Sequence, residues 1–347
     1  MACSRCCGKP DLLALPTLEP IRRITCLMDS PLVSIVIPCH NAERWVADAI
    51  HSALAQTYTS AEVVVVDDGS TDSSPDIIKS FHGRITFECV DHGGAPWARN
   101  RGWQLAKGEF IHFLDADDIL FPSCLSQKIK LALDKDADVV YSGGFFYDLQ
   151  ANAGIYEPQS PQGDSAVETV AHIIANTLVT SQLFFRRTSL EAVGGFDETL
   201  LKGQEHDLLF RLACRGGKFA CLPEALSLNR IGHNPSSITS VTSKNPGHYE
   251  DLLSQFEERL RGTDYWNPQV RSALARRFHI LGVQYLIVGD KENSTKALKH
   301  AKALHQTYTK DLPLSRRFMI PFLGSYRAEK FLRKLRQTFP RPSERIA

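Results

Sequence analysis

The chain has 347 residues, of which 43% are hydrophobic and 23% are charged, so it is long enough for one large or two ordinary domains and is neither mostly disordered nor a coiled coil. Its 40 Lys and Arg residues against 39 Asp and Glu residues give a net charge of +1, which disfavours a general polyanion binder. No apolar run reaches the roughly 18 residues of a membrane-spanning helix. Nine cysteines without an export signal favour reduced thiols, so we expect a cytoplasmic protein.

Residues 1–30 are predicted to form an N-terminal tail, because their apolar residues are scattered among prolines and polar residues. The sequence leaves open whether this tail is translated. Met28 directly precedes the first predicted strand and is an alternative start.

From residue 31 onward, short β-branched runs alternate with helical patterns. The predicted strands are 33–37, 63–66, 85–90, 110–114 and 138–141, and the helices between them are 43–54, 74–81, 95–106 and 123–133. This alternation predicts an α/β fold with βαβ units and a mostly parallel sheet flanked by helices. Ligands of such sheets bind at the carboxyl ends of the strands. Those ends carry residues 38–41, 67–68 and 115–118.

The second half of the chain is less regular. It contains predicted helices at 165–177 and 205–214, a strand-like segment at 181–186, and short strands within 219–231. Residues 31–245 are expected to form the main domain. Residues 246–347 are expected to form a helical extension with helices at 249–260, 268–288 and 294–305. The last two resemble one tetratricopeptide-like unit, which cannot bury its own face and must pack on the main domain or a partner.

The C-terminal end is basic. From residue 311 onward, nine Lys and Arg residues stand against three acidic residues, with apolar side chains between them. Two interpretations remain open: peripheral contact with an anionic membrane surface, or a packed helical cap with a solvated basic face.

Asp115-Ala116-Asp117 follows a predicted strand at the ligand-binding edge. Two carboxylates that converge in a turn can hold a hard divalent cation, Mg²⁺ or Mn²⁺, together with phosphate oxygens. The alternative is an acidic turn in which Asp118 caps a helix. The position at the strand end favours the cation site.

Asp68 ends the second strand in the segment Asp67-Asp68-Gly69-Ser70-Thr71-Asp72. It can accept the imide N–H of uracil or thymine, or the segment can be a simple strand-to-helix turn; the two interpretations are compatible. Further along, Gly93-Gly94 and Arg99 suit a helix N-terminus and a guanidinium near a diphosphate. No dinucleotide, P-loop or nucleophile-elbow motif is present.

Glu205 and Asp207 are the candidate catalytic carboxylates. On a helix they lie about 200° apart, so they cannot face one site. Asp207 can pair with Arg211 at the i,i+4 spacing, which leaves Glu205 as the freer general base. His233, beyond a short strand, is a candidate metal or diphosphate contact.

Six segments in order resemble glycosyltransferase family 2 with its GT-A fold: 33–41, 65–72, 98–102, 113–118, 194–198 and 204–208. The resemblance covers about residues 31–240. It implies inverting transfer of a sugar from a nucleotide-diphosphate donor, UDP- or dTDP-linked, to a hydroxyl of a saccharide or lipid-linked acceptor.

The resemblance also implies roles for single residues. Those expected at the donor nucleotide are Pro38, Asn41, Glu43, Asp68, Arg99 and Asp115, and those expected at the metal are Asp117 and His233. Glu205 stands where this family usually has Asp. The alternatives are a sugar-nucleotide pyrophosphorylase, which would want a Gly-rich basic loop after the first strand, and a non-catalytic nucleotide-sugar-binding module.

Overall fold

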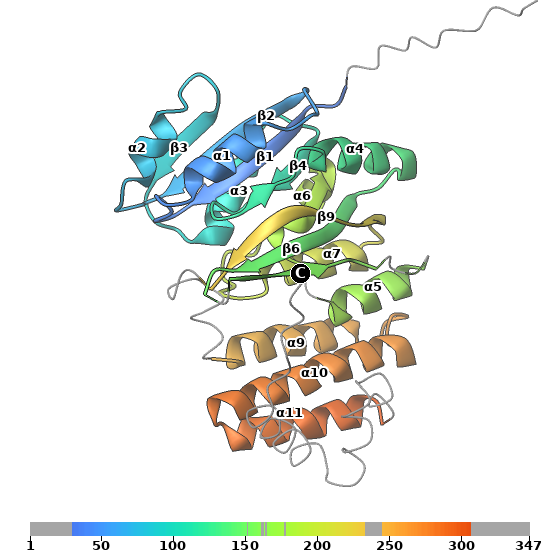
Figure 1. Ribbon diagram of the computed structural model, residues 1–347. Helices are drawn as coiled ribbons and strands as arrows, with labels where there is room; N and C mark the ends of the chain where they lie inside the picture. The colour runs from blue at the N-terminus through green and yellow to red at the C-terminus, as the bar shows by residue number, and fades with distance from the viewer. Residues whose placement is uncertain are drawn as a thin grey trace, which may run out of the picture. The chain divides into compact units, whose positions relative to one another are not determined.

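The computed structural model describes residues 30–306, apart from 151, 161–162, 164, 177 and 233–244. Within these residues a twisted β-sheet lies between two layers of helices (Figure 1). Residues 1–29 of the predicted tail, His233 and the basic end from residue 311 lie outside the described residues.

The first half of the sheet is parallel. Its strands are β1 (Val33–Cys39), β2 (Ala61–Asp68), β3 (Thr86–Val90) and β4 (Phe110–Phe113), in the order β3-β2-β1-β4. The apolar runs of β1, β2 and β4 are buried because helices cover both of their faces. Their carboxyl ends therefore meet at one edge of the sheet, as the sequence predicts.

The second half of the sheet is mixed. Beyond β4 the order is β8-β6-β9-β5, with β7 beside β6. These strands are β5 (Ile119–Leu120), β6 (Val139–Asp148), β7 (Ala153–Glu157), β8 (Leu183–Arg186) and β9 (Phe219–Ile231). β6 and β9 run parallel, whereas β8 runs antiparallel to both β4 and β6. The predicted α/β class with a mostly parallel sheet is confirmed, although β8 interrupts the parallel order.

β9 is one long strand where the sequence suggested several short ones. Its pairing with β6 is irregular on either side of Gly143, where the register shifts twice. A Cβ atom at Gly143 would lie 2.6 Å from the backbone oxygen of Pro223, so only glycine allows this approach. A proline and a bulge inside one strand look like breaks when the sequence is read alone.

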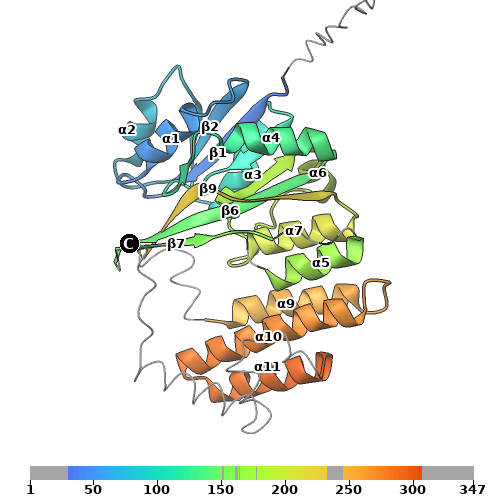
Figure 2. The ribbon, with the colours of Figure 1, turned by 45° about the vertical axis from the view of Figure 1, so that its right-hand side comes forward.

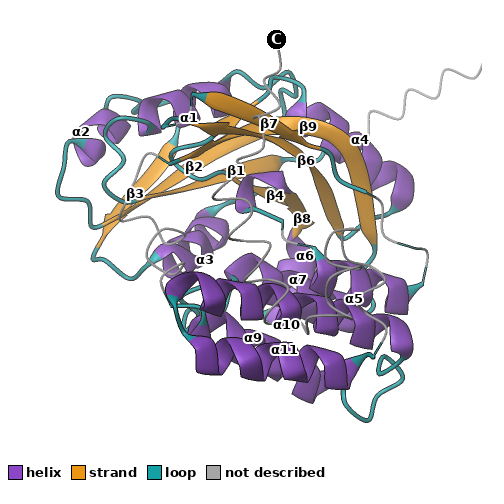
Figure 3. Ribbon diagram, turned by 60° about the horizontal axis from the view of Figure 1, so that its bottom comes forward, coloured by secondary structure: helices purple, strands orange, loops and turns teal. Residues whose placement is uncertain are grey.

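The two helical layers pack on opposite faces of the sheet (Figure 3). One layer holds α1 (Val46–Leu54), α2 (Ser74–Lys79) and α4 (Cys124–Lys135). The other holds α3 (Ala95–Leu105), α5 (Ala166–Ala175), α6 (Arg187–Val193) and α7 (Gln204–Cys214). Strand side chains alternate between them: Ile35 and Ile37 face the first layer, and Val36 faces the second.

Residues 245–306, which the structure describes after the gap at 233–244, contain three helices: α9 (Gly247–Leu260), α10 (Pro268–Val288) and α11 (Lys291–Leu304). They lie on the α5 and α7 side of the sheet, with α10 against α5 (Figure 2). Phe210 of α7 stacks on Phe256 of α9 with ring centroids 3.9 Å apart. One apolar cluster therefore runs from Val36 in the sheet to Phe278 in α10. The pair formed by α10 and α11 therefore buries its apolar face on the rest of the chain. The domain boundary expected near residue 245 stays a prediction.

Among the residues that the structure describes, none of the helices combines the length and the apolar character needed to span a bilayer.

Candidate active site

The acidic turn after β4 faces the edge where the parallel strands end. The N–H of Asp118 donates to the backbone oxygen of Asp115 at 3.0 Å, which closes the turn. Arg230, from the far end of β9, donates from Nη1 to the backbone oxygen of Asp117 at 3.0 Å. Three carboxylates are thereby held close together on one short segment.

Asp118 is the buried member of this turn. It accepts hydrogen bonds from Ser181 Oγ at 2.5 Å, Asn229 Nδ2 at 2.5 Å and the backbone N–H of Arg230 at 3.1 Å. Burial raises the pKa of Asp118 well above its ordinary value, and the neighbouring Asp117 and Asp115 raise it further. The reading of Asp118 as a helix cap is wrong, because β5 follows it and Ser123 precedes α4.

Arg99 of α3 connects the acidic turn to the first turn of α7. Its Nη2 lies 2.9 Å from Asp115 Oδ1, its Nη1 lies 2.7 Å from Gln204 Oε1, and the same Nη1 lies 3.4 Å from Glu205 Oε1. The Arg99 side chain is only 7% exposed. Burial lowers the pKa of Arg99, but Asp115 and Glu205 outweigh it and raise that pKa, so the guanidinium stays charged.

For the pKa of Asp115, burial outweighs the effect of its ion-pair partner. Burial raises its pKa, Arg99 lowers it, and Asp117 raises it again, so the net direction is upward. The turn thus holds partly buried carboxylates close to one another beside a single guanidinium. A divalent cation between carboxylate oxygens would reduce this repulsion.

Glu205 reaches the same cluster from the start of α7. Its Oε1 accepts a hydrogen bond from Thr180 Oγ1 at 2.6 Å, and its side chain is 20% exposed. Thr180 begins the short 3₁₀ turn η1 (Thr180–Gln182) before β8. This pair holds a carboxylate beside Arg99 while leaving part of it open to solvent.

Asp207 is not part of this cluster. Its side chain is 3% exposed, and its Oδ2 accepts from Arg211 Nε at 2.7 Å. Arg211 also donates to the backbone oxygens of Val193 and Gly195, so Asp207 orients the arginine that ties α7 to the turn after α6. The i,i+4 pairing expected from the sequence is present.

The remaining donor-side candidates lie around the end of β1. Pro38 pairs with Val66 inside the sheet. Asn41, at a φ of 50°, accepts the N–H of Thr71 at 2.8 Å. Glu43 accepts the N–H of Ser73 at 3.0 Å. The loop after β1 is thus fastened to the loop after β2.

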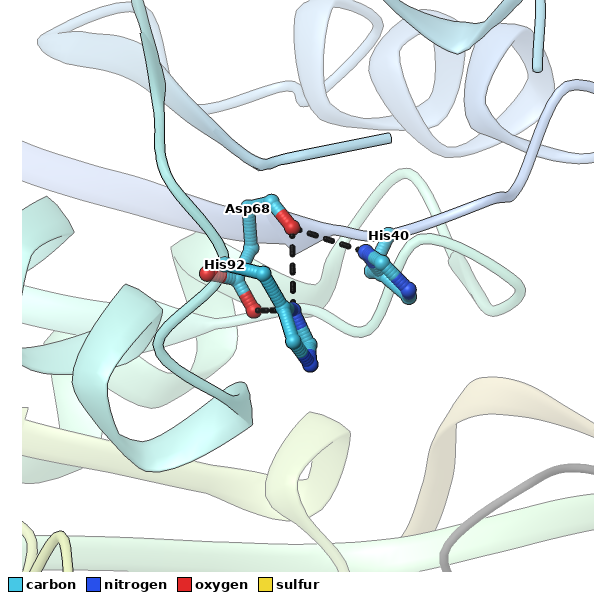
Figure 4. Close-up of side chains that lie close together, drawn as sticks. All are labelled: His40, Asp68 and His92. Atoms are coloured by element: carbon cyan, nitrogen blue, oxygen red, sulfur yellow. Dashed lines mark hydrogen bonds and ion pairs between the residues drawn. The ribbon is translucent and has the colours of Figure 1, made fainter. Parts of the chain in front are cut away.

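Asp68 lies between these loops and the start of α3. Its Oδ1 accepts the N–H of Gly93 at 2.7 Å, and its Oδ2 accepts that of Gly94 at 2.9 Å. His92 Nδ1 lies 2.9 Å from the same Oδ2 (Figure 4). The Asp68 side chain is only 3% exposed, so an imide N–H reaches it only if His92 shifts.

The structure therefore brings Arg99, Asp115 and Glu205 into one cluster beside Asp117, and places Asn41, Glu43 and Asp68 in a second group. Sequence reasoning missed Thr180, Gln204 and His92, because a single Thr, Gln or His carries no spacing signal. Only Gln204 could have been noticed from the sequence, because it directly precedes Glu205 in a motif that resembles the family.

A family model described as "Glycosyl transferase family 2" matches residues 34–194, which ends before Glu205. A relative from Rickettsia prowazekii, "Uncharacterized glycosyltransferase RP339", is 31% identical over 241 residues, covering 67% of this chain and 73% of the relative. "Glycosyltransferase GlyG" of Streptococcus pneumoniae is 37% identical over 123 residues, covering 34% of this chain and 41% of that protein.

Solved structures share the fold at lower identity. TarS 1-349 of S. aureus in complex with UDP-GlcNAc is 18% identical with a TM-score of 0.51, covering 79% of this chain and 92% of TarS 1-349. The mannosyltransferase PcManGT of Pyrobaculum calidifontis, in complex with GDP-Man and Mn²⁺, is 17% identical with a TM-score of 0.54, covering 90% of this chain and 88% of that one.

The sheet and these structural likenesses define the GT-A fold. Within that class, the sequence matches are decisive: the chain belongs to glycosyltransferase family 2.

Proposed function

We propose that this glycosyltransferase transfers a sugar from a UDP- or dTDP-linked donor to a hydroxyl of a saccharide or lipid-linked acceptor, with inversion at the anomeric carbon. The observation that carries the proposal is Arg99, which contacts Asp115 on the donor side and Glu205 on the acceptor side. Donor-binding and proton-accepting groups are thereby held next to each other.

On the donor side, Pro38, Asn41, Glu43 and Asp68 form the proposed nucleoside pocket, and Arg99 and Asp115 lie toward the ribose and diphosphate. The two loops that carry Asn41 and Asp68 meet at the strand ends, where α/β sheets bind their ligands. TarS and PcManGT bind UDP-GlcNAc and GDP-Man respectively, so a nucleotide sugar fits this fold while the fold alone does not select the base.

A hard divalent cation, Mg²⁺ or Mn²⁺, fits the acidic turn. Asp117 is the proposed ligand, and His233 is a second candidate outside the described residues. Burial is the main cause of the raised pKa values of Asp115 and Asp118, and the neighbouring carboxylates raise them further, which supports a cation at this turn. Such a cation would supply charge neutralisation for the diphosphate leaving group.

Glu205 is the proposed general base. Its carboxylate takes the proton of the acceptor hydroxyl while that oxygen forms a bond to the anomeric carbon. The bond from that carbon to the donor diphosphate breaks on the opposite face, so the configuration inverts. Thr180 orients the Glu205 carboxylate. Asp207, the second carboxylate that the sequence offered as catalytic, is proposed to have a positioning role, which its buried ion pair with Arg211 supports.

Nucleotide release from a panel of nucleotide sugars, measured with and without EDTA, tests this proposal. Wild type is expected to release UDP or dTDP with an acceptor and to lose this activity in EDTA. Asp117→Ala and Glu205→Gln are expected to be inactive, the latter with donor binding retained. Full turnover by Asp117→Ala would refute the metal assignment. UDP binding by calorimetry without turnover on any acceptor would favour a non-catalytic binding module.

The basic end is proposed to contact an anionic membrane surface that carries lipid-linked acceptors. Co-sedimentation of full-length protein and of residues 1–310 with anionic liposomes tests this. Equal sedimentation of both would refute the role of the basic end.

A further inference from the structure

Two exposed histidines lie side by side at the ends of parallel strands. His40 follows β1, His92 follows β3, and Asp68 ends β2 between them. The imidazole rings stack with centroids 4.3 Å apart and an interplanar angle of 29°. The proposed transfer reaction uses neither ring.

The hydrogen bonds of both rings fix which nitrogen carries a proton. Nδ1 of His40 lies 2.7 Å, and Nδ1 of His92 lies 3.1 Å, from the backbone oxygen of Asp68, which can only accept. Each Nδ1 therefore donates, and each Nε2 of a neutral ring keeps its lone pair. Figure 4 shows both Nε2 atoms on the side of the rings away from Asp68. Asn41 Nδ2, a donor, lies 3.1 Å from Nε2 of His40, which agrees with this assignment.

This arrangement is the one that metal-binding histidines use. An imidazole that binds a metal through one nitrogen usually donates its other N–H to a carbonyl or carboxylate, which fixes the ring orientation. Asp68 supplies its carbonyl to both rings and its Oδ2 to His92 at 2.9 Å. Asp68 is itself held by the N–H groups of Gly93 and Gly94, so the support under both rings is buried and hydrogen-bonded.

The backbone is shaped to bring His92 to Asp68. Gly69 has a φ of 67°, and a Cβ atom there would lie 2.8 Å from the backbone nitrogen of His92. Any larger residue would push the His92 loop away and would also strain the backbone. The approach of the two histidines therefore depends on glycine at this position.

We propose that His40 and His92, oriented by Asp68, form a binding site for one transition-metal cation of the Zn²⁺ or Co²⁺ type. One ring nitrogen of each histidine, either Nδ1 or Nε2, and a carboxylate oxygen of Asp68 lie within 4.8 Å of one another, so the three side chains share one small region. Metal–nitrogen bonds are about 2.0–2.1 Å long, so the two exposed rings must turn from their stacked arrangement to direct both Nε2 atoms at one cation, which then replaces the contact with Asn41. Imidazole ligands select this class of metal over Mg²⁺, which prefers the oxygen ligands of the acidic turn.

Occupancy has a consequence that rests on the proposed function. Because Asn41 and Asp68 line the proposed nucleoside pocket, a cation on His40 and His92 occupies space next to the base. Zn²⁺ bound there is expected to compete with UDP, whereas Mg²⁺ or Mn²⁺ at Asp117 is expected to assist UDP.

The test begins with the full-length protein, freed of metal and of any affinity tag. Co²⁺ is titrated and followed by visible absorption, and Zn²⁺ is titrated by calorimetry, both without nucleotide. One equivalent of cation is expected to bind with an affinity that depends on both histidines, separately from any cation at the acidic turn. His40→Gln and His92→Gln are each expected to weaken binding by at least about tenfold. Both side chains are exposed, so equal denaturant midpoints are expected to confirm that the variants fold.

Two control variants separate this site from others. His82→Gln removes another exposed histidine, and Asp117→Asn alters the acidic turn; both are expected to keep the histidine-dependent Co²⁺ binding of wild type. Equal affinity in wild type, His40→Gln and His92→Gln would overturn the proposal, as would loss of Co²⁺ binding in Asp117→Asn alone. A UDP titration with Zn²⁺ present comes last. Zn²⁺ binding that depends on His40 without any effect on UDP would leave the metal site intact and would contradict the proposed nucleoside pocket.

Discussion

Arg99 Nη2 lies 2.9 Å from Asp115 Oδ1, and this contact joins helix α3 to the turn that follows strand β4. The other arm of the same guanidinium lies 3.4 Å from Glu205. The guanidinium group is planar, and its N–H donors point in fixed directions. Buried between two carboxylates, it therefore fixes the distance between them. The spacing between the donor side and the proposed base is thereby set by one residue.

Replacing Arg99 by Lys is expected to lower kcat by about 10- to 150-fold, because hydrogen bonds to charged groups contribute about 1.5–3 kcal/mol and an ammonium cannot span both carboxylates. Steady-state kinetics of nucleotide release measure this. Arg101→Lys is the matched control, since Arg101 lies on the same helix and pairs with Glu88 at the surface. It is expected to keep wild-type kcat, and an equal loss in both variants would contradict the bridging role of Arg99.

Glu205→Gln is expected to lower catalytic activity, whereas Asp207→Asn is expected to lower the stability of the fold. Loss of a general base lowers kcat by about 10²- to 10⁴-fold, with little change in the denaturant midpoint. Asp207→Asn removes the charge opposite Arg211 and is expected to lower the free energy of unfolding by about 2 kcal/mol. Kinetics and urea titrations on both variants provide the measurements. If the Asp207→Asn enzyme were as inactive as Glu205→Gln and kept wild-type stability, the positioning role of Asp207 would be contradicted, and Asp207 would become a candidate for the general base.

Stability is expected to fall as the pH drops below about 6.5. Burial, and then the positive charge of Arg277, lower the pKa of His206 to about 3, so the native state keeps this ring neutral. The unfolded chain takes up a proton near pH 6.5, and stability is therefore present above that pH and lost on the way down toward pH 3. The loss is about 1.4 kcal/mol per pH unit, or about 2 kcal/mol at pH 5.

Urea titrations at pH 7.5, 6 and 5 test this dependence. His112, which is buried and also has a strongly lowered pKa, adds a loss of the same sign. His206→Gln is expected to make the free energy of unfolding fall less steeply as the pH decreases. The fall that remains is the contribution of His112. A variant whose stability falls as steeply as that of wild type would show that His206 is not the group that titrates.

Gly102→Ala is expected to destabilise the fold although alanine favours helices. A Cβ atom at Gly102 would lie 2.3 Å from Cγ1 of Val36, which is buried in β1. Overpacking a rigid core typically costs about 1–3 kcal/mol, which exceeds the gain of about 1 kcal/mol in helix propensity. Thermal unfolding measures the difference. Gln104→Ala, at an exposed position of α3, is expected to have little effect, and a stabilised Gly102→Ala would show that α3 can move away from the sheet.

Much of the fold was predictable because the parallel strands are buried on both faces. Continuous β-branched runs such as 33–37 and 63–66 can form little else when amphipathic helices lie between them. α10 was predicted with the bounds that the structure has, since Pro268 begins it and Gly289 ends it. β5, β7 and α6 were missed, because elements this short carry no periodic signal.

The candidate site was predictable only in part. Asp115, Asp117 and Glu205 follow from motifs and from their positions at element ends. Thr180 and His92 do not, because their roles arise from residues that are distant in sequence: Thr180 contacts Glu205 across 25 positions, and His92 contacts Asp68 across 24.

The sequence by itself determined the order of strands and helices, and with it the edge of the sheet where acidic residues gather, because burial periodicity and strand ends are local properties of the chain. Only the tertiary structure decided which of those side chains touch. Arg99 reaches Glu205, and His40 stacks on His92, because the packing of α3 on the sheet and the loops at the strand ends bring them together. Hydrogen bonds and ion pairs act over a few ångströms, and such distances are set by the packed chain rather than by residue order.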